Sequence, residues 1–141
     1  MATFLLKTEP TEYSFDDLLR DGRARWDGIT NHAALAHLRT ARAGDEALIY
    51  HTGEERAIVG LARIIGDPFP DPARPEKALA GAPRFAVVDL APVKKARAPA
   101  TLAAIKADPR FCAFALVRQG RLSVMTVPPD LDRVLRRLCG L

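Results

Sequence analysis

The chain has 141 residues, of which 48% are hydrophobic and 27% charged, and this length and composition are those of one folded domain over residues 1–141. Its apolar runs are far shorter than the ~20 residues that cross a bilayer, and its first residues lack the pattern of an export signal, so we expect neither a membrane protein nor a secreted one. The formal net charge of +4 is compatible with a polyanionic partner.

The start of the chain predicts a strand followed by a short helix. Residues 4–7 read as a strand that ends before Pro10, because proline lacks a backbone donor and stiffens the chain. Ser14 and Asp17 have the spacing of a capping box, and Gly22 is placed to end the helix in the left-handed conformation.

An irregular or extended segment, residues 23–28, then leads to a second helix. Asn31 is a good N-cap residue, because its side chain accepts a hydrogen bond from a free N–H group of the first turn. Leu35 and Leu38 share one face of this helix with Ala34, which predicts that this face is buried.

The middle of the chain predicts a hairpin and a long loop. Residues 47–51 and 57–65 are strand candidates joined by the turn residues 52–55, and Gly60 is placed to allow a bulge or close packing. Residues 67–83 contain five prolines and are expected to form one surface loop.

The last third of the chain predicts two more strands and two helices. Residues 85–90 resume the sheet and run toward Lys94 and Lys95, and Thr101 caps a small helix that stops at Asp108 and Pro109. Residues 122–125 form the last strand, and Pro129 opens the final helix. The apolar face of that helix is expected to contain Leu131, Val134, Leu135 and Leu138. About five or six strands, mostly joined by hairpins, with peripheral helices, predict an α+β domain around a curved sheet or small barrel.

The sequence gives little support for metal or nucleophile chemistry. His32 and His37 are five positions apart, about 140° around a helix axis, and do not converge on one ion. Cys112 and Cys139 lack CxxC spacing, which favours a reduced, cytoplasmic location without a disulfide. Ser123 has no nucleophile elbow around it. We expect no metal and no cofactor.

Lys7, Thr8 and Glu9 place an ammonium, a hydroxyl and a carboxylate in a row. On a strand, Lys7 and Glu9 face one side of the sheet and Thr8 faces the other. A catalytic set would therefore need partners from elsewhere in the chain, and an enzyme is the less favoured interpretation.

The segment from Trp26 to Asn31 contains the parts of a nucleobase pocket. Trp26 is the chain's single tryptophan and is expected to lie outside regular structure, and an aromatic face stacks on any base. The carboxylate of Asp27 and the amide of Asn31 can read the edge of a base, and Gly28 allows the backbone to approach a flat ligand. A core tryptophan is the alternative interpretation.

Several separate motifs, in order along the whole chain, resemble the EVE domain family. They are Leu5-Leu6-Lys7-Thr8-Glu9-Pro10, Tyr13-Ser14, Trp26-Asp27-Gly28-Ile29, Asn31, Gly44-Asp45, Tyr50-His51-Thr52, Val59-Gly60-Leu61-Ala62, Arg118-Gln119 and Arg121-Leu122-Ser123-Val124. The resemblance implies a PUA-like mixed β-barrel with peripheral helices. It also implies a non-catalytic domain that binds DNA or RNA carrying a modified base, with the base flipped or single-stranded.

The resemblance also implies which residues hold the base. Trp26 and Asn31 would form the pocket, with Tyr50 and His51 nearby. Weaker candidates come from the end of the first strand and from the last strand: Thr8, Glu9, Arg121, Leu122 and Ser123.

The chain departs from the family pattern beside the expected pocket. Thr30 stands where the family commonly has arginine. The following helix offers Ala33, Leu35 and Ala36 instead of polar residues. A good bidentate contact is worth about 1–3 kcal/mol of discrimination, so these changes are expected to alter the choice of base or weaken binding.

Two other functions remain open. Another PUA-like branch, the ASCH group, includes amidohydrolases of acylated nucleosides that use lysine, threonine and glutamate, the residue types of Lys7, Thr8 and Glu9. A protein-interaction module with a degenerate pocket is the second alternative.

Overall fold

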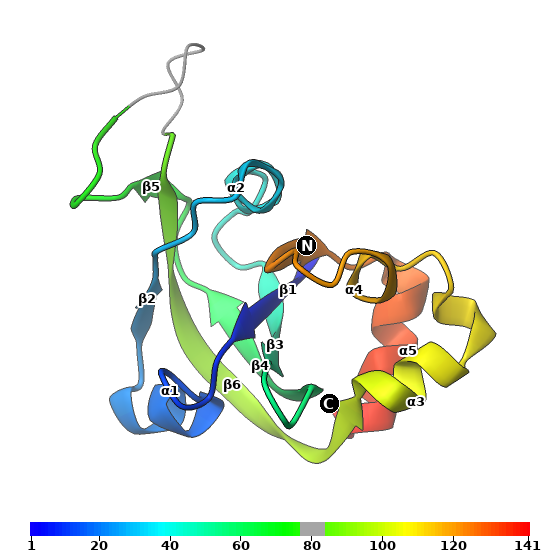
Figure 1. The fold of residues 1–141 in the computed structure, drawn as a ribbon. Helices are drawn as coiled ribbons and strands as arrows, with labels where there is room; N and C mark the ends of the chain where they lie inside the picture. Colours follow the sequence, from blue (N-terminus) through cyan, green and yellow to red (C-terminus); the bar gives the residue numbers. More distant parts are fainter. Residues whose placement is uncertain (77–83) are drawn as a thin grey trace.

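The computed structural model describes residues 1–76 and 84–141, and one curled sheet with helices around it forms its centre (Figure 1). The elements in chain order are β1 (Thr3–Thr8), α1 (Phe15–Asp21), β2 (Ala24–Trp26), α2 (His32–Arg39), β3 (Glu46–His51), β4 (Ala57–Ile64), β5 (Phe69–Pro70), β6 (Ala86–Thr101), α3 (Leu102–Ala107), a 3-10 turn (Pro109–Phe111), α4 (Ala115–Arg118), β7 (Val124–Thr126) and α5 (Pro129–Cys139).

The strand order is β2-β6-β4-β3-β1-β7, with β5 paired to β6. The predicted α+β class is confirmed, although β5 brings the strands of the described residues to seven. The expectation of mostly hairpin connections is wrong for β1, which pairs in parallel with β3 and antiparallel with β7. Parallel neighbours need a long crossover connection, and here α1, β2 and α2 supply it.

The β3–β4 hairpin is confirmed, and its predicted glycine packs closely. A Cβ on Gly60 would lie 2.5 Å from the ring of Phe15, the first residue of α1. Phe15 is almost fully buried, so the absence of a side chain at Gly60 lets α1 dock on the sheet. Since α1 leads directly into β2, this contact helps to position the crossover.

Strand β6 continues past Lys94 and Lys95, where the sequence was expected to leave the sheet, and ends at Thr101. Its register against β4 shifts at two places, one of them between Leu61 and Ala62, where Ala62 pairs with Pro92. Bulges bend a strand and admit proline, so β6 can curl across the sheet and pair with β2, β4 and β5. Pro99 lies beyond Lys95 and argues against a strand in the sequence, which is why the sequence does not show that β6 reaches Thr101.

The predicted helix caps are confirmed. The side chains of Ser14, Asn31 and Thr101 accept hydrogen bonds from backbone N–H groups in the first turns of α1, α2 and α3. Gly22 ends α1 with a φ of 72°. Local chemistry fixed these boundaries, because each cap needs one short polar side chain or one glycine.

Several other expectations are wrong. Trp26 lies inside regular structure, as the last residue of β2. Leu138 of α5 is 46% exposed, and Cys139 is buried instead, because the buried face of α5 follows its contact with β6.

The expected proline-rich loop contains β5, and its residues 77–83 lie outside the described residues. The 3-10 turn and α4 are too short for a helical period to be seen in the sequence.

Candidate functional site

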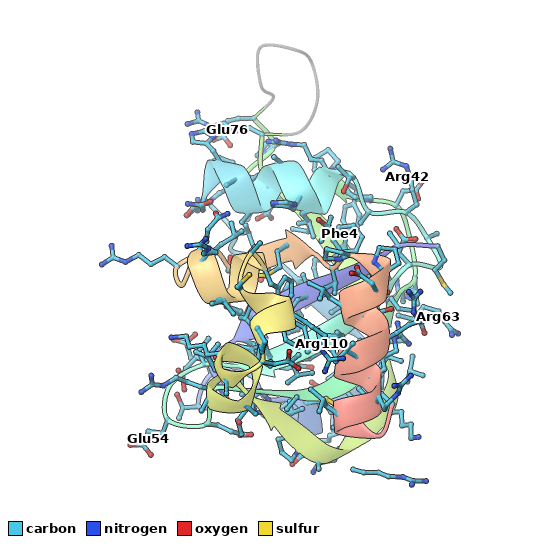
Figure 2. The ribbon with its side chains drawn as sticks, turned by 90° about the vertical axis from the view of Figure 1, so that its right-hand side faces the viewer. Phe4, Arg42, Glu54, Arg63, Glu76 and Arg110 are labelled. Carbon is cyan, nitrogen blue, oxygen red and sulfur yellow. The ribbon has the colours of Figure 1, made fainter. Side chains whose placement is uncertain are left out.

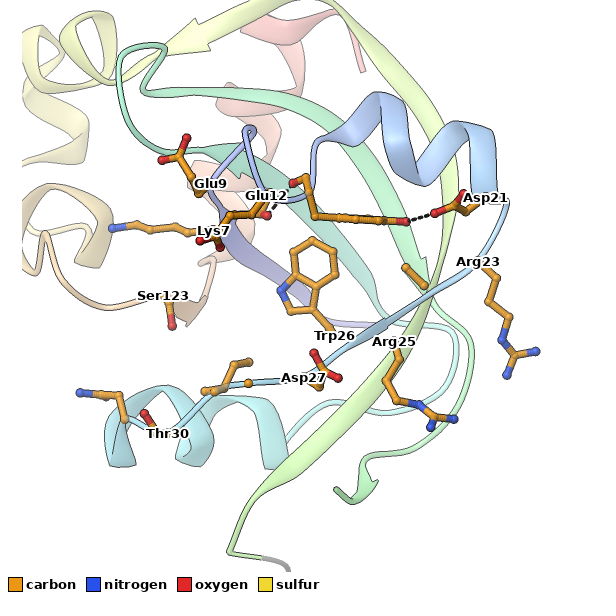
Figure 3. Close-up of a pocket in the computed structure, with 16 residues that line it drawn as sticks. Lys7, Glu9, Glu12, Asp21, Arg23, Arg25, Trp26, Asp27, Thr30 and Ser123 are labelled. Carbon is orange, nitrogen blue, oxygen red and sulfur yellow. Dashed lines mark hydrogen bonds between the residues drawn. The ribbon is translucent and has the colours of Figure 1, made fainter. Parts of the chain in front are cut away.

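A cavity of about 670 Å³ lies between the end of β1, strand β2 and the segment that leads into α2 (Figure 3). It therefore sits inside the crossover that joins the parallel strands β1 and β3. Its lining consists of Lys7, Thr8, Glu9, Glu12, Tyr13, Asp21, Arg23, Ala24, Arg25, Trp26, Asp27, Gly28, Ile29, Thr30, Asn31 and Ser123.

Trp26 forms the aromatic wall of the cavity. Its residue surface is 9% exposed, and Tyr13 packs against it edge to face, with ring centroids 6.1 Å apart. The indole Nε1 makes no hydrogen bond to the described residues and is open to solvent, and Figure 3 shows it directed toward the side of the cavity where Ser123 lies. A buried aromatic group with a free donor is thus presented to the cavity.

Tyr13 is held in place from the other side. Its hydroxyl donates to Oδ2 of Asp21 at 2.9 Å. Burial, and then this hydrogen bond, raise the pKa of Tyr13 to about 12. The phenol is therefore neutral at physiological pH, and the Tyr13–Trp26 pair forms a stable aromatic corner.

Strand β2 is tied to β6 by charge as well as by backbone pairing. Trp26 pairs with Val88 in the antiparallel register. Asp89 accepts from Arg23 at 2.8 Å and from Arg25 at 3.2 Å. The Arg23 hydrogen bond is the main reason why the pKa of Asp89 lies below its usual range. These bonds fix the strand that presents Trp26.

The segment after Trp26 brings further polar groups to the rim. Gly28 has a φ of 75°, the left-handed conformation that glycine adopts without strain. Asn31 Oδ1 caps α2 by accepting from the N–H of Ala34 at 3.0 Å, which leaves its amide NH₂ group as a free donor within the described chain. The exposed carboxylate of Asp27 likewise has no partner among residues 1–76 and 84–141.

Lys7 and Thr8 at the end of β1, and Glu9 directly after it, line the cavity but do not bond to one another through their side chains. Lys7 Nζ donates to the carbonyl of Gly120 at 3.0 Å, and burial lowers its pKa. Thr8 Oγ1 donates to the carbonyl of Tyr13 at 2.6 Å. Glu9 accepts from Thr52 Oγ1 at 3.0 Å, and this bond is the first cause of its lowered pKa. Glu9 also accepts from the N–H and the hydroxyl of Thr11, so the polar atoms of the three residues serve separate contacts.

The structure brings together Trp26, Asn31, Thr8, Glu9 and Ser123 of the predicted site residues. The other four lie outside the lining of this cavity. Tyr50 borders a smaller hollow of about 270 Å³, beneath the ammonium of Lys7. Arg121 and Leu122 border a hollow of about 310 Å³ that shares Asn31 with the main cavity.

His51, the fourth, is buried and engaged on both ring nitrogens. Its Nε2 accepts from the N–H of Phe15 at 3.0 Å, and Nδ1 lies 3.1 Å from the carboxylate of Glu55. The N–H at the start of α1 therefore finds its partner in β3.

Sequence reasoning missed Tyr13 and Glu12 as parts of the lining. Both lie in the turn between β1 and α1, and no periodicity marks a turn residue as facing a cavity. The sequence does contain one indication of this role, because Tyr13 is an aromatic residue directly before the helix cap Ser14.

The fold and the cavity define a small α+β domain whose crossover holds one aromatic-walled cavity with free polar groups at its rim. Within the described residues, no helix is long and apolar enough to span a membrane. The family model of the EVE domain matches residues 2–137, so the chain belongs to the EVE domain family, and its fold is PUA-like as predicted.

Known relatives match this chain in sequence and in fold. Human thymocyte nuclear protein 1 is 33% identical over an alignment of 86 positions, and the match covers 52% of this chain and 38% of that protein, which is well under half of the relative's length. The solution structure of Rpa0253 from Rhodopseudomonas palustris is 37% identical, with a TM-score of 0.88, and the alignment covers 99% of this chain and 94% of that one.

A further solved structure is that of human THYN1 in complex with DNA containing 5-methylcytosine. It superimposes with a TM-score of 0.85 at 24% identity, over 97% of both chains. At this identity the likeness shows the fold.

Proposed function

We propose that this EVE domain binds a modified nucleobase of DNA or RNA, presented flipped or single-stranded, and does not transform it. The observation that carries the proposal is the cavity, in which Trp26 is nine-tenths buried while its Nε1 remains free. Unpaired polar groups beside an apolar wall are costly unless water or a ligand satisfies them.

The free groups match the edge of a base that bears an amino group. The carboxylate of Asp27 accepts only, so it suits the exocyclic amino group of cytosine or adenine. Trp26 Nε1 and the Asn31 amide donate, so they suit ring nitrogen or carbonyl acceptors. A base entering the cavity contacts the exposed part of the indole. A duplex hides these base edges in its paired stack, which is why extrusion or a single strand is needed.

The neighbouring hollow offers a place for the strand on either side of the base. Arg121 is exposed and borders the hollow that shares Asn31 with the main cavity. A guanidinium there would contact phosphate, which positions a strand without reading its sequence. The human relative's complex with methylated DNA supports the same class of ligand.

Fluorescence of the single tryptophan tests the proposal. Nucleosides and short oligonucleotides with modified cytosine or adenine are titrated at low salt, and we expect a saturable change for at least one of them. Asp27→Asn should weaken that ligand about tenfold, by loss of an acceptor. Glu54→Gln is the matched control, since Glu54 is exposed in the β3–β4 loop (Figure 2) and is not among the residues that line the cavity. No response from any ligand, or equal effects of the two variants, would contradict the proposal.

One observation favours a second candidate, hydrolysis of an acylated nucleoside. Lys7, Thr8 and Glu9 all line the cavity, and a lowered pKa favours the neutral amine of Lys7. The test is product formation from N4-acetylcytidine and its loss in Lys7→Ala. If the nucleoside binds but no product forms at any incubation time or protein concentration, hydrolysis is excluded and the non-catalytic base-binding function remains.

A further inference from the structure

A second charged surface lies away from the cavity, where α5 packs against β6. A shallow depression of about 570 Å³ lies there. Its lining consists of Lys94, Arg97, Arg133, Arg136, Arg137, Gly140 and Leu141. We call it the α5–β6 basic surface.

Arg136 forms the neutralised part of this surface. It donates to Asp132 at 2.9 Å and to Glu46 at 3.1 Å, and Arg63 approaches Glu46 at 3.6 Å. Figure 2 shows Arg63 beside α5. The two nearby carboxylates are therefore used by Arg136 and Arg63.

The other four cations are not neutralised. Lys94, Arg97, Arg133 and Arg137 are exposed, and the described residues place no carboxylate within 4 Å of their charged nitrogens. The helix dipole explains Arg136 and Arg137, which lie in the last turn of α5. It does not explain Arg133 in the middle of the helix, nor the two cations that β6 contributes.

The chemistry of this surface suits a polyanion better than a protein. Protein interfaces have an apolar, often aromatic centre that is poor in charge, whereas Leu141 is the one large apolar residue in this lining. Three of the four free cations are arginines, and a guanidinium pairs with phosphate through two parallel hydrogen bonds.

The surface is separate from the Trp26 cavity. In Figure 1, β2 and α5 lie on opposite sides of the molecule. Trp26 pairs with Val88, and Arg97 is nine residues further along β6, at most roughly 30 Å at ~3.3 Å per residue. A nucleic-acid strand of about 25 nucleotides is longer than this path and can contact both the cavity and the basic surface. A single nucleoside is too small to contact both at once.

We propose that the α5–β6 basic surface is a second nucleic-acid site, which binds the phosphate backbone independently of sequence through Lys94, Arg97, Arg133 and Arg137. Each arginine that contacts a phosphate of a single strand releases counterions. Loss of one contact lowers the salt slope by about 0.7 and the affinity about fivefold at about 0.1 M salt.

The test measures binding of a labelled 25-residue oligothymidylate, whose bases carry no amino group for the cavity to read. We expect Arg137→Gln to weaken it about fivefold, and the pair Arg133→Gln with Arg137→Gln about 25-fold. Lys106→Gln is the matched control, because Lys106 is also exposed in the last turn of a helix. It should change binding less than twofold.

Two further measurements keep the outcome clear. The double variant Arg133→Lys with Arg137→Lys keeps both positive charges, so it should retain most of the affinity that the double glutamine variant loses. Polyglutamate of equal charge should displace the oligonucleotide poorly. Equal losses in the double variant and the control, or displacement by polyglutamate as efficient as by unlabelled oligonucleotide, would overturn the proposal.

The α5–β6 basic surface and the Trp26 cavity can be tested separately. Binding of a modified nucleoside, followed by Trp26 fluorescence, should be the same in the wild-type chain and in the double variant. If no base binds but the oligothymidylate result holds, the α5–β6 basic surface stands and the proposed base pocket falls.

Discussion

The segment around Trp26 and the segment around His51 both contain residue types suited to a base, yet the structure treats them differently. Trp26 and Asn31 present donors that remain free toward a cavity. His51 has both ring nitrogens engaged, one by the N–H of Phe15 and one by Glu55. The capacity to bind a ligand therefore follows from which polar groups are unsatisfied, and residue type alone does not decide it.

The position of each strand in the sheet explains the difference. Strand β3 lies between β4 and β1, and all six of its residues are buried. In the part of the chain that the structure describes, strand β2 pairs with β6 alone, at the edge of the sheet. An edge strand inside a crossover leaves one side open, and the cavity occupies that side.

The largest expected effect is at Trp26. Trp26→Ala should lower the free energy of unfolding by about 3–5 kcal/mol, because it removes a nine-tenths buried aromatic side chain. Trp26→Phe keeps much of the packing but lacks the Nε1 donor, so it should fold and bind the base at least about tenfold more weakly. Because Trp26→Phe has no tryptophan fluorescence, its affinity for the base is measured by calorimetric titration. Wild-type affinity in Trp26→Phe would show that the indole does not face the ligand.

His51→Ala should separate stability from binding. The Phe15 N–H loses its acceptor, which should cost about 1–3 kcal/mol of unfolding free energy, while base affinity changes less than twofold. Chemical denaturation gives the first quantity and titration the second. His37→Ala on α2, where the ring has no such role, is the control. A large loss of base affinity with an unchanged melting curve would place His51 in the site after all.

Gly28→Ala tests the backbone of the cavity segment. The substitution meets no atom within 4 Å, but forces alanine to a φ of 75°, which should cost about 1–2 kcal/mol. Gly66→Ala meets equally open space without a positive φ and should be nearly neutral. Equal melting temperatures of the two variants would refute the strain argument.

The smallest effect is expected at Tyr13. Tyr13→Phe removes the hydrogen bond to the exposed Asp21, worth about 0.5 kcal/mol, and keeps the aromatic contact. Because the pKa of Tyr13 rises to about 12 in the folded state, its contribution is full below pH 10 and is lost as the pH rises toward 12. Denaturation at pH 8 to 12 should thus show a shallower alkaline loss in the variant. An identical alkaline limb would exclude Tyr13 as its source.

Local chemistry was sufficient to predict much of the fold and part of the site. Ser14, Asn31 and Thr101 are caps, and Gly60 is a point of close packing, as the sequence indicates. The family resemblance rests on motifs from both ends of the chain and is confirmed over residues 2–137. These features depend on one or a few neighbouring residues, and so a single sequence reveals them.

The tertiary structure alone decided which groups share a cavity. The parallel pairing of β1 with β3 makes β2 part of a crossover and brings Tyr13 to Trp26. The bulges of β6 bend this strand, so that it extends from its pairing with Trp26 to the basic surface beside α5. The prolines of β6 make this continuous strand hard to recognise in the sequence. Long-range strand pairing sets both the cavity and the basic surface, because the contacts join residues that are far apart in the chain. No local sequence pattern shows which free donor will face which cavity.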